Sequence, residues 1–154
     1  MITVITYGTY DLFHVGHVRL LKRLSELGDR LIVGISSDEF NKIKGKTSFF
    51  SYEERAEIVK ACQYVDAVFP EHHWEQKIGD IKKYEANIFA MGDDWKGKFD
   101  FLKEYCEVIY LERTEGISTT EIKNTLSHLN KKELDKVEKS LHDVISIVKA
   151  ISLK

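Results

Sequence analysis

The sequence of 154 residues has only one proline, Pro70, and only two cysteines, Cys62 and Cys106. The two cysteines lack the spacing of a metal or redox motif, so we expect buried free thiols and exclude a disulfide framework. Linkers, low-complexity tracts and internal repeats are also absent, which favours one main domain for a chain of this length.

Long apolar runs and a strong charge of one sign are missing as well. No stretch reaches the roughly 20 apolar residues that a membrane span needs, and residues 1–3 open no signal peptide. The sequence therefore predicts a cytoplasmic protein without membrane insertion. The formal net charge of −2 gives no reason to expect nucleic acid as a partner.

The chain does contain a fivefold alternation of apolar strands and helical patterns. This alternation predicts an α/β fold, a doubly wound five-stranded parallel sheet with right-handed crossovers and helices on both faces. The Rossmann-like strand order 3-2-1-4-5 is the simplest, and it places strands one and four at the topological switch point. The expected strands are residues 2–7, 30–36, 65–69, 87–91 and 107–111.

Between these strands, helical patterns cover residues 14–27, 52–63, 75–84 and about 120–129. Gly28 stands where a helix C-cap glycine belongs, and Pro70 is expected to end the third strand. Residues 37–50 are expected to form a long polar connection that carries Lys42, Lys44 and Lys46 around Gly45. A short helical segment is expected around residues 99–105.

The first turn of the expected sheet, residues 8–17, reads G-T-Y-D-L-F-H-V-G-H. His14 and His17 are three residues apart, so they project from nearly the same side of the first helical turn. A helix N-terminus adds free N–H groups and a positive dipole end, which suit phosphate. The pattern favours a site for a phosphate that gains negative charge during reaction. Two alternatives are a histidine pair without chemistry and a zinc site, although no Cys or His cluster completes four zinc ligands.

A second motif, R-T-E-G-I-S-T-T at residues 113–120, connects the fifth strand to the next helix. Ser118 or Thr119 is a natural N-cap, and Glu121 can complete a capping box with Ser118. Capping alone does not explain an arginine five residues earlier, whose guanidinium can fork across two phosphate oxygens. The segment is either a capped helix after a solvated loop or a second phosphate-binding loop.

As a pair, the two motifs resemble the signatures of the cytidylyltransferase branch of the His-x-Gly-His nucleotidyltransferase superfamily. Four shorter motifs resemble the members of that branch that act on glycerol 3-phosphate: K-x-K at 44–46, S-Y-E-E-R at 51–55, W-E-Q-K at 74–77 and M-G-D-D-W at 91–95. The resemblance covers residues 1 to about 126, nearly the whole predicted sheet domain.

The resemblance implies transfer of CMP from CTP to sn-glycerol 3-phosphate, giving CDP-glycerol and pyrophosphate for a bacterial surface polymer such as teichoic acid or capsule. It also implies Mg²⁺ carried by CTP, and a homodimer. Another phosphorylated alcohol or amino alcohol as acceptor stays open. A nucleotide-binding regulatory module without turnover is a third possibility, which the retained histidines and Arg113 disfavour.

The same resemblance implies roles for individual residues. The catalytic set is His14, His17, Lys46 and Arg113. The nucleotide-binding set is Thr9, Tyr10, His14, His17, Lys46, Asp94, Arg113, Thr114, Gly116, Ile117, Ser118, Thr119 and Thr120. The substrate-binding set is Asp11, Lys44, Trp74 and Lys77. No metal site made by the protein is expected, because substrate phosphates commonly carry magnesium.

Several of these residues also have structural interpretations. Lys44 and Lys46 could be a solvated charge run, and Asp94 could cap a turn rather than contact the base or ribose. Asp11 could cap the first helix, or orient a histidine or a metal. Arg55 resembles an arginine of the branch that supports the active site and the subunit interface.

Residues 130–154 extend beyond the nucleotidyltransferase domain predicted for residues 1–129, and they predict an amphipathic C-terminal helix. From Leu134 to Ile151, apolar residues recur with spacing 3-4-3-4-3, which is a narrow seam at heptad positions. The seam could pack on its own domain, or pair across a homodimer or with another protein.

Overall fold

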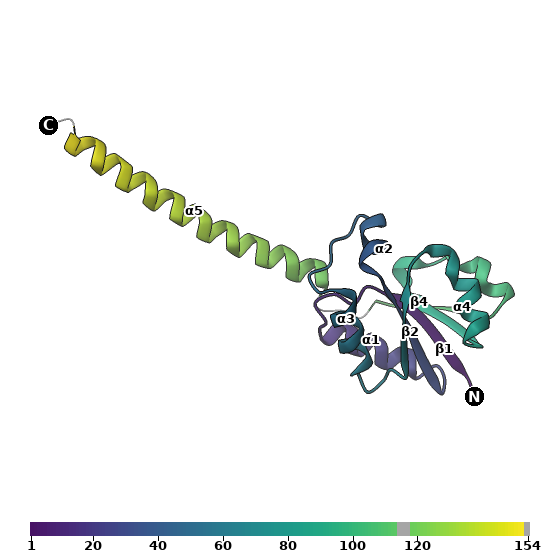
Figure 1. Ribbon diagram of the computed structural model, residues 1–154. Coiled ribbons are helices and arrows are strands. Elements are labelled where there is room, and N and C mark those ends of the chain that lie inside the picture. The colour runs from purple at the N-terminus through teal and green to yellow at the C-terminus, as the bar shows by residue number, and fades with distance from the viewer. Residues whose placement is uncertain (114–117, 153–154) are drawn as a thin grey trace. The chain divides into compact units, whose positions relative to one another are not determined.

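The computed structural model describes residues 1–113 and 118–152. The chain forms two compact units, Met1–Ile117 and Ser118–Lys154. In the described residues, the first unit contains the five-stranded sheet and the second forms one long helix (Figure 1).

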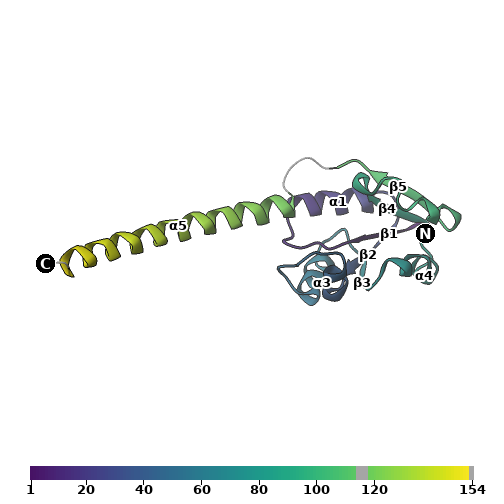
Figure 2. The same cartoon turned by 90° about the horizontal axis from the view of Figure 1, so that it is seen from above.

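Five parallel strands form the sheet of the first unit, in the order β3-β2-β1-β4-β5. Figure 2 shows β5 beside β4 at one edge and β3 at the other. This arrangement confirms the predicted fold class and strand order. The strands are β1 (Thr3–Gly8), β2 (Arg30–Ser36), β3 (Ala67–Glu71), β4 (Ile88–Gly92) and β5 (Glu107–Leu111).

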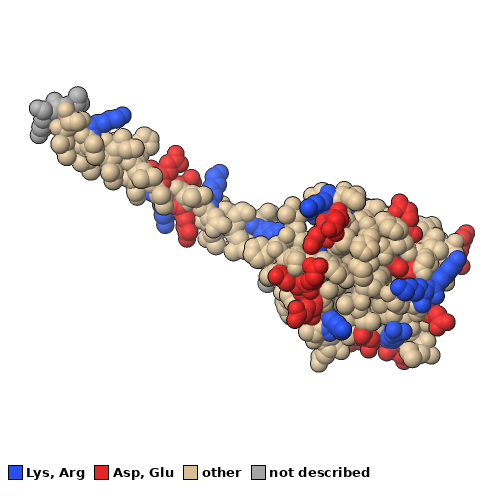
Figure 3. Space-filling view, viewed as in Figure 1, with Lys and Arg blue, Asp and Glu red and all other residues tan. Residues whose placement is uncertain are grey.

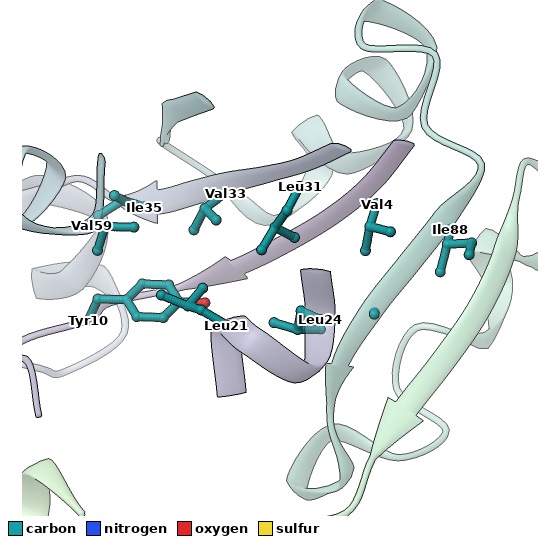
Figure 4. Packing of buried hydrophobic residues seen from close by; sticks show 10 residues of the cluster. Val4, Tyr10, Leu21, Leu24, Leu31, Val33, Ile35, Val59 and Ile88 are labelled. Carbon is teal, nitrogen blue, oxygen red and sulfur yellow. The ribbon is translucent and has the colours of Figure 1, made fainter. Parts of the chain in front are cut away.

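Helices cover both faces of this sheet (Figure 1). One face packs on α1 (Val15–Ser25) and α3 (Tyr52–Lys60), through Leu21, Leu24 and Val59. Figure 4 shows these side chains against those of β1 and β2, all of them apolar because a central parallel strand is buried on both faces. The other face packs on α4 (Lys77–Lys83) and on the 3₁₀ helix η3 (Asp100–Glu104).

The remaining elements of the first unit lie in connections that follow the strands. They are α2 (Asp38–Ile43) after β2, and the 3₁₀ helices η1 (Trp74–Gln76) after β3 and η2 (Asp93–Trp95) after β4. In a parallel sheet these connections all emerge at the carboxyl edge, where ligands bind.

The prediction of a long polar connection over residues 37–50 missed the helix α2. Ser37 caps α2 by accepting a hydrogen bond from the Phe40 N–H at 3.1 Å. Phe40 is 1% exposed and anchors this helix in the protein interior. The polar residues around Phe40 hid a single apolar anchor, which is enough to hold a helix of six residues.

The predicted roles of Gly28 and Pro70 were also wrong. α1 ends with Glu26 at the C-cap, and Gly28 does not adopt positive φ. A Cβ at Gly28 would lie 2.7 Å from the Ile2 carbonyl oxygen, so the glycine permits close approach of two backbones. Pro70 lies inside β3, opposite Ile35, rather than ending the strand. Because β3 is an edge strand, it tolerates a residue without an N–H.

The second unit is α5 (Thr119–Ser152), 34 residues long. The predicted end near residue 129 is absent, because no glycine or proline interrupts residues 119–152. Ser118 Oγ accepts a hydrogen bond from the Glu121 N–H at 3.1 Å, and Glu121 Oε2 accepts one from the Ser118 N–H at 3.4 Å. These bonds confirm the predicted capping box. The prediction that residues 1–129 form the enzyme domain stays a prediction.

The surface charge, the two thiols and the length of the helices can be compared with the sequence predictions. On the face shown in Figure 3, basic and acidic side chains are interspersed over the first unit, in keeping with the net charge of −2. Cys62 and Cys106 are free, as predicted, but the prediction that they are buried was wrong, because both are only partly buried. Within residues 1–113 and 118–152, no helix is both long enough and apolar enough to cross a membrane.

Candidate active site

The turn between β1 and α1 is sharply folded. Tyr10 and Leu12 adopt φ of 54° and 47°, a region that side chains other than glycine rarely occupy. Gly8 permits this path, because a Cβ there would lie 2.7 Å from the Tyr10 ring. Such backbone strain persists only where surrounding contacts fix it, and two such contacts come from Asp11 and Arg55.

His14 and His17 hold each other at the N-terminus of α1. His14 is the N-cap, and its Nδ1 accepts a hydrogen bond from the Gly16 N–H at 3.0 Å. The His14 N–H in turn donates to His17 Nδ1 at 3.1 Å. The two ring centroids are 4.0 Å apart. The predicted pair therefore forms a reciprocal capping box made by two imidazoles rather than by hydroxyl and carboxylate.

Aromatic rings surround His17. Phe13 stacks on its imidazole at 5.3 Å between centroids, and the Tyr10 ring lies at 5.5 Å. Burial lowers the pKa of His17 to about 4, with His14 adding to the shift and Asp11 opposing it. Burial also lowers the pKa of His14. Both imidazoles are therefore neutral near pH 7.

The hydrogen bonds fix the tautomer of both histidines. Nδ1 of each ring accepts a backbone N–H, so in the neutral imidazole the proton is on Nε2. Each ring thus has an Nε2–H donor, and α1 adds the positive end of its dipole. Neutral donors at a helix N-terminus suit the oxygens of a phosphate.

Asp11 ties the turn to the segment that precedes α3. Its carboxylate accepts hydrogen bonds from the N–H groups of Phe49, at 2.7 Å, and Phe50, at 3.0 Å. Asp11 is 3% exposed. The predicted substrate role of Asp11 stays untested, but its carboxylate is already engaged in fixing the loop beside the histidines.

Arg55 links three segments from the protein interior, where it is fully buried. It donates to the Thr9 carbonyl at 2.9 Å, to the Phe50 carbonyl at 3.1 Å and to Asp38 Oδ1 at 2.9 Å. Hydrogen bonds from the Tyr52 N–H and from Arg55, together with the Arg55 charge, lower the pKa of Asp38 against the opposing effect of burial. Arg55 thus joins the turn, α2 and α3.

A second group of charged side chains lies at the carboxyl ends of β2 and β3. Lys77 Nζ donates to Glu71 Oε2 at 2.6 Å, and both residues are buried. Ser36 Oγ donates to Glu71 Oε1 at 3.1 Å and accepts from Lys44 Nζ at 2.8 Å. Both ammonium groups lie near the Trp74 ring, Lys44 at 5.8 Å and Lys77 at 4.7 Å from its centroid. We call these five residues the lysine–tryptophan cluster.

Aromatic side chains hold Trp74 in this cluster. Its ring centroid lies 5.2 Å from that of Phe40, 5.6 Å from that of Trp95 and 6.5 Å from that of Phe99. Phe40 comes from α2 and Trp95 from η2, so the loops after β2, β3 and β4 meet at Trp74. Three of the predicted substrate-binding residues, Lys44, Trp74 and Lys77, are therefore brought together.

The predicted nucleotide-binding residues Tyr10, Thr9, Lys46 and Asp94 differ in their burial and in their contacts. Tyr10 is 6% exposed, and its ring packs in the core beside Leu21 (Figure 4). The ring therefore supports the β1–α1 turn from the interior. Thr9 Oγ1 donates to Asn41 Oδ1 at 3.2 Å. The Lys46 side chain is exposed, while its N–H donates to the Asn41 carbonyl at 2.8 Å. Asp94 is exposed at η2, where a nucleoside could reach it.

The second motif is described only in part. Arg113 is exposed at the end of the first unit. The predicted contacts of Thr114, Gly116 and Ile117 lie outside the described residues. Ser118, Thr119 and Thr120 form the start of the second unit, so their predicted role in phosphate binding stays a prediction.

Ser36 and Glu71 are two site residues that the sequence analysis missed. They have no local motif, but each is the last residue of a parallel strand, and the two are paired in register. A search for polar residues at strand ends would have found them, because the carboxyl edge of such a sheet is where ligands bind.

The described residues do not form a protein-held metal centre. In the parts of the chain that the structure describes, no three His, Cys, Asp or Glu side chains converge as a metal ion would require. The donors at the histidines are N–H groups, and those of the lysine–tryptophan cluster are ammonium groups; both suit anions.

Comparison with known protein families shows which family this chain belongs to. The sequence model described as cytidylyltransferase-like matches residues 5–125. The chain belongs to the cytidylyltransferase-like family. That match spans the β1–α1 turn, the lysine–tryptophan cluster and the first turns of α5, so family membership covers every feature of the candidate site.

Relatives within the family are very similar to this chain. A glycerol-3-phosphate cytidylyltransferase of Bacillus spizizenii is 62% identical over 126 residues, covering 82% of this chain and 98% of the relative. One from Staphylococcus aureus is 58% identical over 123 residues, covering 80% and 93%. A solved structure of a lipopolysaccharide core biosynthesis protein from Thermoplasma volcanium superposes with a TM-score of 0.68 at 22% identity, covering 75% of this chain and 99% of that one, which supports the fold alone.

Proposed function

We propose that this chain is a glycerol-3-phosphate cytidylyltransferase, which transfers CMP from CTP to sn-glycerol 3-phosphate and releases pyrophosphate. The observation that carries the proposal is the pairing of two sites in one unit. One is a helix N-terminus with two neutral histidines, and the other is a cluster with two lysines. Family membership and the names of relatives at 62% and 58% identity support the choice of substrates.

The reaction is an in-line displacement at the α-phosphorus of CTP. A phosphate oxygen of glycerol 3-phosphate attacks this phosphorus, a new P–O bond forms, and the bond to the β-phosphate oxygen breaks as pyrophosphate leaves with its electron pair. The attacking phosphate is already largely a dianion near neutral pH, so the protein needs no general base. Catalysis is then mainly positioning and stabilisation of charge in the transition state.

His14 and His17 stabilise the charge that builds on the CTP phosphates. Their Nε2–H groups are donors already oriented by the bonds at Nδ1, so no reorganisation is needed at the moment of reaction. The stacked Phe13 and the Tyr10 ring keep the His17 imidazole in place. A neutral imidazole can donate without first taking a proton from solvent.

The lysine–tryptophan cluster binds the phosphate of the acceptor. Lys77 is 1% exposed, and it lies over the rings of Tyr7 and Trp74 at 4.6 and 4.7 Å. Lys44 is the more accessible of the two ammonium groups. Two cations beside aromatic rings suit a compact phosphate monoester, while Trp74 offers an apolar surface for a short carbon chain.

Further parts of the proposal concern the surroundings of the reaction. Magnesium, carried by the CTP phosphates, would supply charge neutralisation of the triphosphate. Two copies of the chain form a homodimer in a cytoplasmic compartment. CDP-glycerol then serves a reaction that polymerises glycerol phosphate at a bacterial surface. Each of these follows from the family resemblance rather than from the described contacts.

The decisive experiment measures pyrophosphate release with each of four nucleoside triphosphates crossed against glycerol 3-phosphate, phosphocholine and phosphoethanolamine. We expect turnover with CTP and glycerol 3-phosphate and formation of CDP-glycerol. His14→Ala and His17→Ala should each lose activity by about a hundredfold to a thousandfold while staying folded, because each removes an oriented donor. His142→Ala on α5 is the matched control. A preference for an amino alcohol phosphate would contradict the proposed acceptor.

A further inference from the structure

The buried carboxylate of Glu71 connects the two lysines of the lysine–tryptophan cluster. Its Oε2 accepts from Lys77 Nζ at 2.6 Å. Its Oε1 accepts from Ser36 Oγ at 3.1 Å, and that hydroxyl accepts from Lys44 Nζ at 2.8 Å. One carboxylate therefore fixes one ammonium group directly and the other through a single hydroxyl.

Glu71 and Ser36 lie outside the two signature motifs, yet both are polar and buried. Buried polar side chains of this kind need an explanation. Glu71 is 2% exposed and Ser36 is fully buried. A buried ion pair is weak evidence for stability, since desolvation offsets much of the attraction. Here the pair lies at the carboxyl ends of β2 and β3, at the edge of the sheet where ligands bind.

The charges of the cluster fit a phosphate ligand. Two lysines and one glutamate leave one net positive charge, which attracts a phosphate anion. Without Glu71, the repulsion between the two ammonium groups would be uncompensated, and the buried Lys77 would lack a counter-charge. The carboxylate therefore keeps two cations beside Trp74 before the ligand arrives.

We propose that Glu71 is a positioning residue for the acceptor phosphate, holding Lys77 directly and Lys44 through Ser36. The inference rests on the proposed function, in which these two lysines bind the acceptor. Glu71 and Ser36 touch neither substrate. They act by setting where the two ammonium groups lie.

The cluster also sets the protonation of Lys44. Burial lowers the pKa of Lys44 to about 8, Glu71 opposes this shift, and Lys46, Lys77 and Arg55 add to it. If the charge of Glu71 is removed, the pKa of Lys44 falls further. Lys44 then loses its proton at lower pH, and acceptor binding weakens at lower pH.

The test compares three variants of the full chain by steady-state kinetics from about pH 6 to about pH 9. Glu71→Gln removes the charge while keeping the shape. Ser36→Ala removes only the connection to Lys44 and keeps the Glu71–Lys77 pair. Glu75→Gln is the matched control, because it removes the same charge from a side chain that is 83% exposed four residues away.

We expect Glu71→Gln to raise the KM for glycerol 3-phosphate by between about tenfold and about a hundredfold, since displaced positioning groups have effects of this size. The KM for CTP should change by less than about twofold. The alkaline decline of kcat/KM for glycerol 3-phosphate should move to lower pH. Ser36→Ala should raise the same KM to a smaller extent, and Glu75→Gln should match the wild type.

An unchanged KM for glycerol 3-phosphate in both Glu71→Gln and Ser36→Ala overturns the inference. Equal rises in the KM of both substrates also overturn it, because they indicate a general structural role. If Glu71→Gln fails to fold, Ser36→Ala decides alone. If the wild type shows no CMP transfer, the proposed function fails, and calorimetric binding of inorganic phosphate to the wild type and to Ser36→Ala then decides the inference separately.

Discussion

Asp11 and Arg55 hold the same residue, Phe50, from its two backbone groups. Asp11 accepts a hydrogen bond from the Phe50 N–H at 3.0 Å, and Arg55 donates to the Phe50 carbonyl at 3.1 Å. Asp11 belongs to the turn between β1 and α1, and Arg55 also donates to the carbonyl of Thr9 in that turn. The strained turn and the segment before α3 are therefore joined by two buried side chains.

Replacing Arg55 by lysine should destabilise the protein. Lysine has one compact ammonium group and cannot reproduce the three-way fork, so about two hydrogen bonds are lost, at about 1 kcal/mol each. We expect the free energy of unfolding to fall by about 2 kcal/mol, measured by urea denaturation. Arg19→Lys, at an exposed position of α1, is the control and should change it by less than about 0.5 kcal/mol. A similar small change at Arg55 would mean that the three contacts do not stabilise the fold.

The histidine pair should make stability depend on pH. Burial lowers the pKa of His17 to about 4 in the folded state, against an ordinary value of about 6.5. Between these values the unfolded chain binds a proton that the folded chain does not, so stability is fully present above about pH 6.5 and is lost as the pH falls toward 4. The loss attributable to His17 by pH 4 is about 3 kcal/mol.

A His17→Gln variant checks this prediction. Its free energy of unfolding should fall less steeply between about pH 6.5 and pH 4 than that of the wild type, because one titrating group is gone. NMR of the ring nitrogens should show both histidines neutral at pH 7 with the proton on Nε2. Parallel pH curves for the variant and the wild type, or a positively charged His17 at pH 6, would contradict the assignment.

Arg113 tests the second motif, which the structure describes only at its two ends. Arg113→Lys keeps the charge and loses the planar fork that can bind two phosphate oxygens. We expect kcat/KM for CTP to fall by at least about tenfold, somewhat less than removal of an oriented donor would cause. A value within about threefold of the wild type would place Arg113 outside the nucleotide site.

The apolar stripe of α5 should contribute to assembly. Leu134, Val137, Leu141 and Ile151 are each more than half exposed, and an amphipathic helix must bury such a stripe on something. We expect deletion of residues 131–154 to weaken the proposed homodimer, measured by sedimentation, while kcat of the assembled enzyme stays nearly unchanged. An unchanged oligomer would mean that the stripe has another partner, and a loss of kcat with the dimer intact would mean that the tail serves the active site.

The sequence by itself determined the elements and the order of the sheet. Apolar runs such as Ile32 to Ile35 predicted strands, because a central parallel strand is buried on both faces. The spacing of His14 and His17 predicted their common side, because three residues make nearly one helical turn. The prediction failed at α2 and at Pro70, where one buried anchor and an edge position overrode local composition.

Only the tertiary structure decided how distant residues combine. Ser36 and Glu71 are 35 residues apart, yet the register of β2 and β3 places them side by side, where they hold Lys44 and Lys77. Arg55 meets Thr9 across 46 residues of sequence. Local patterns fix helices and strands through backbone geometry and periodic burial. Contacts between chain-distant polar groups depend on strand register and on packing, which no short stretch of sequence contains.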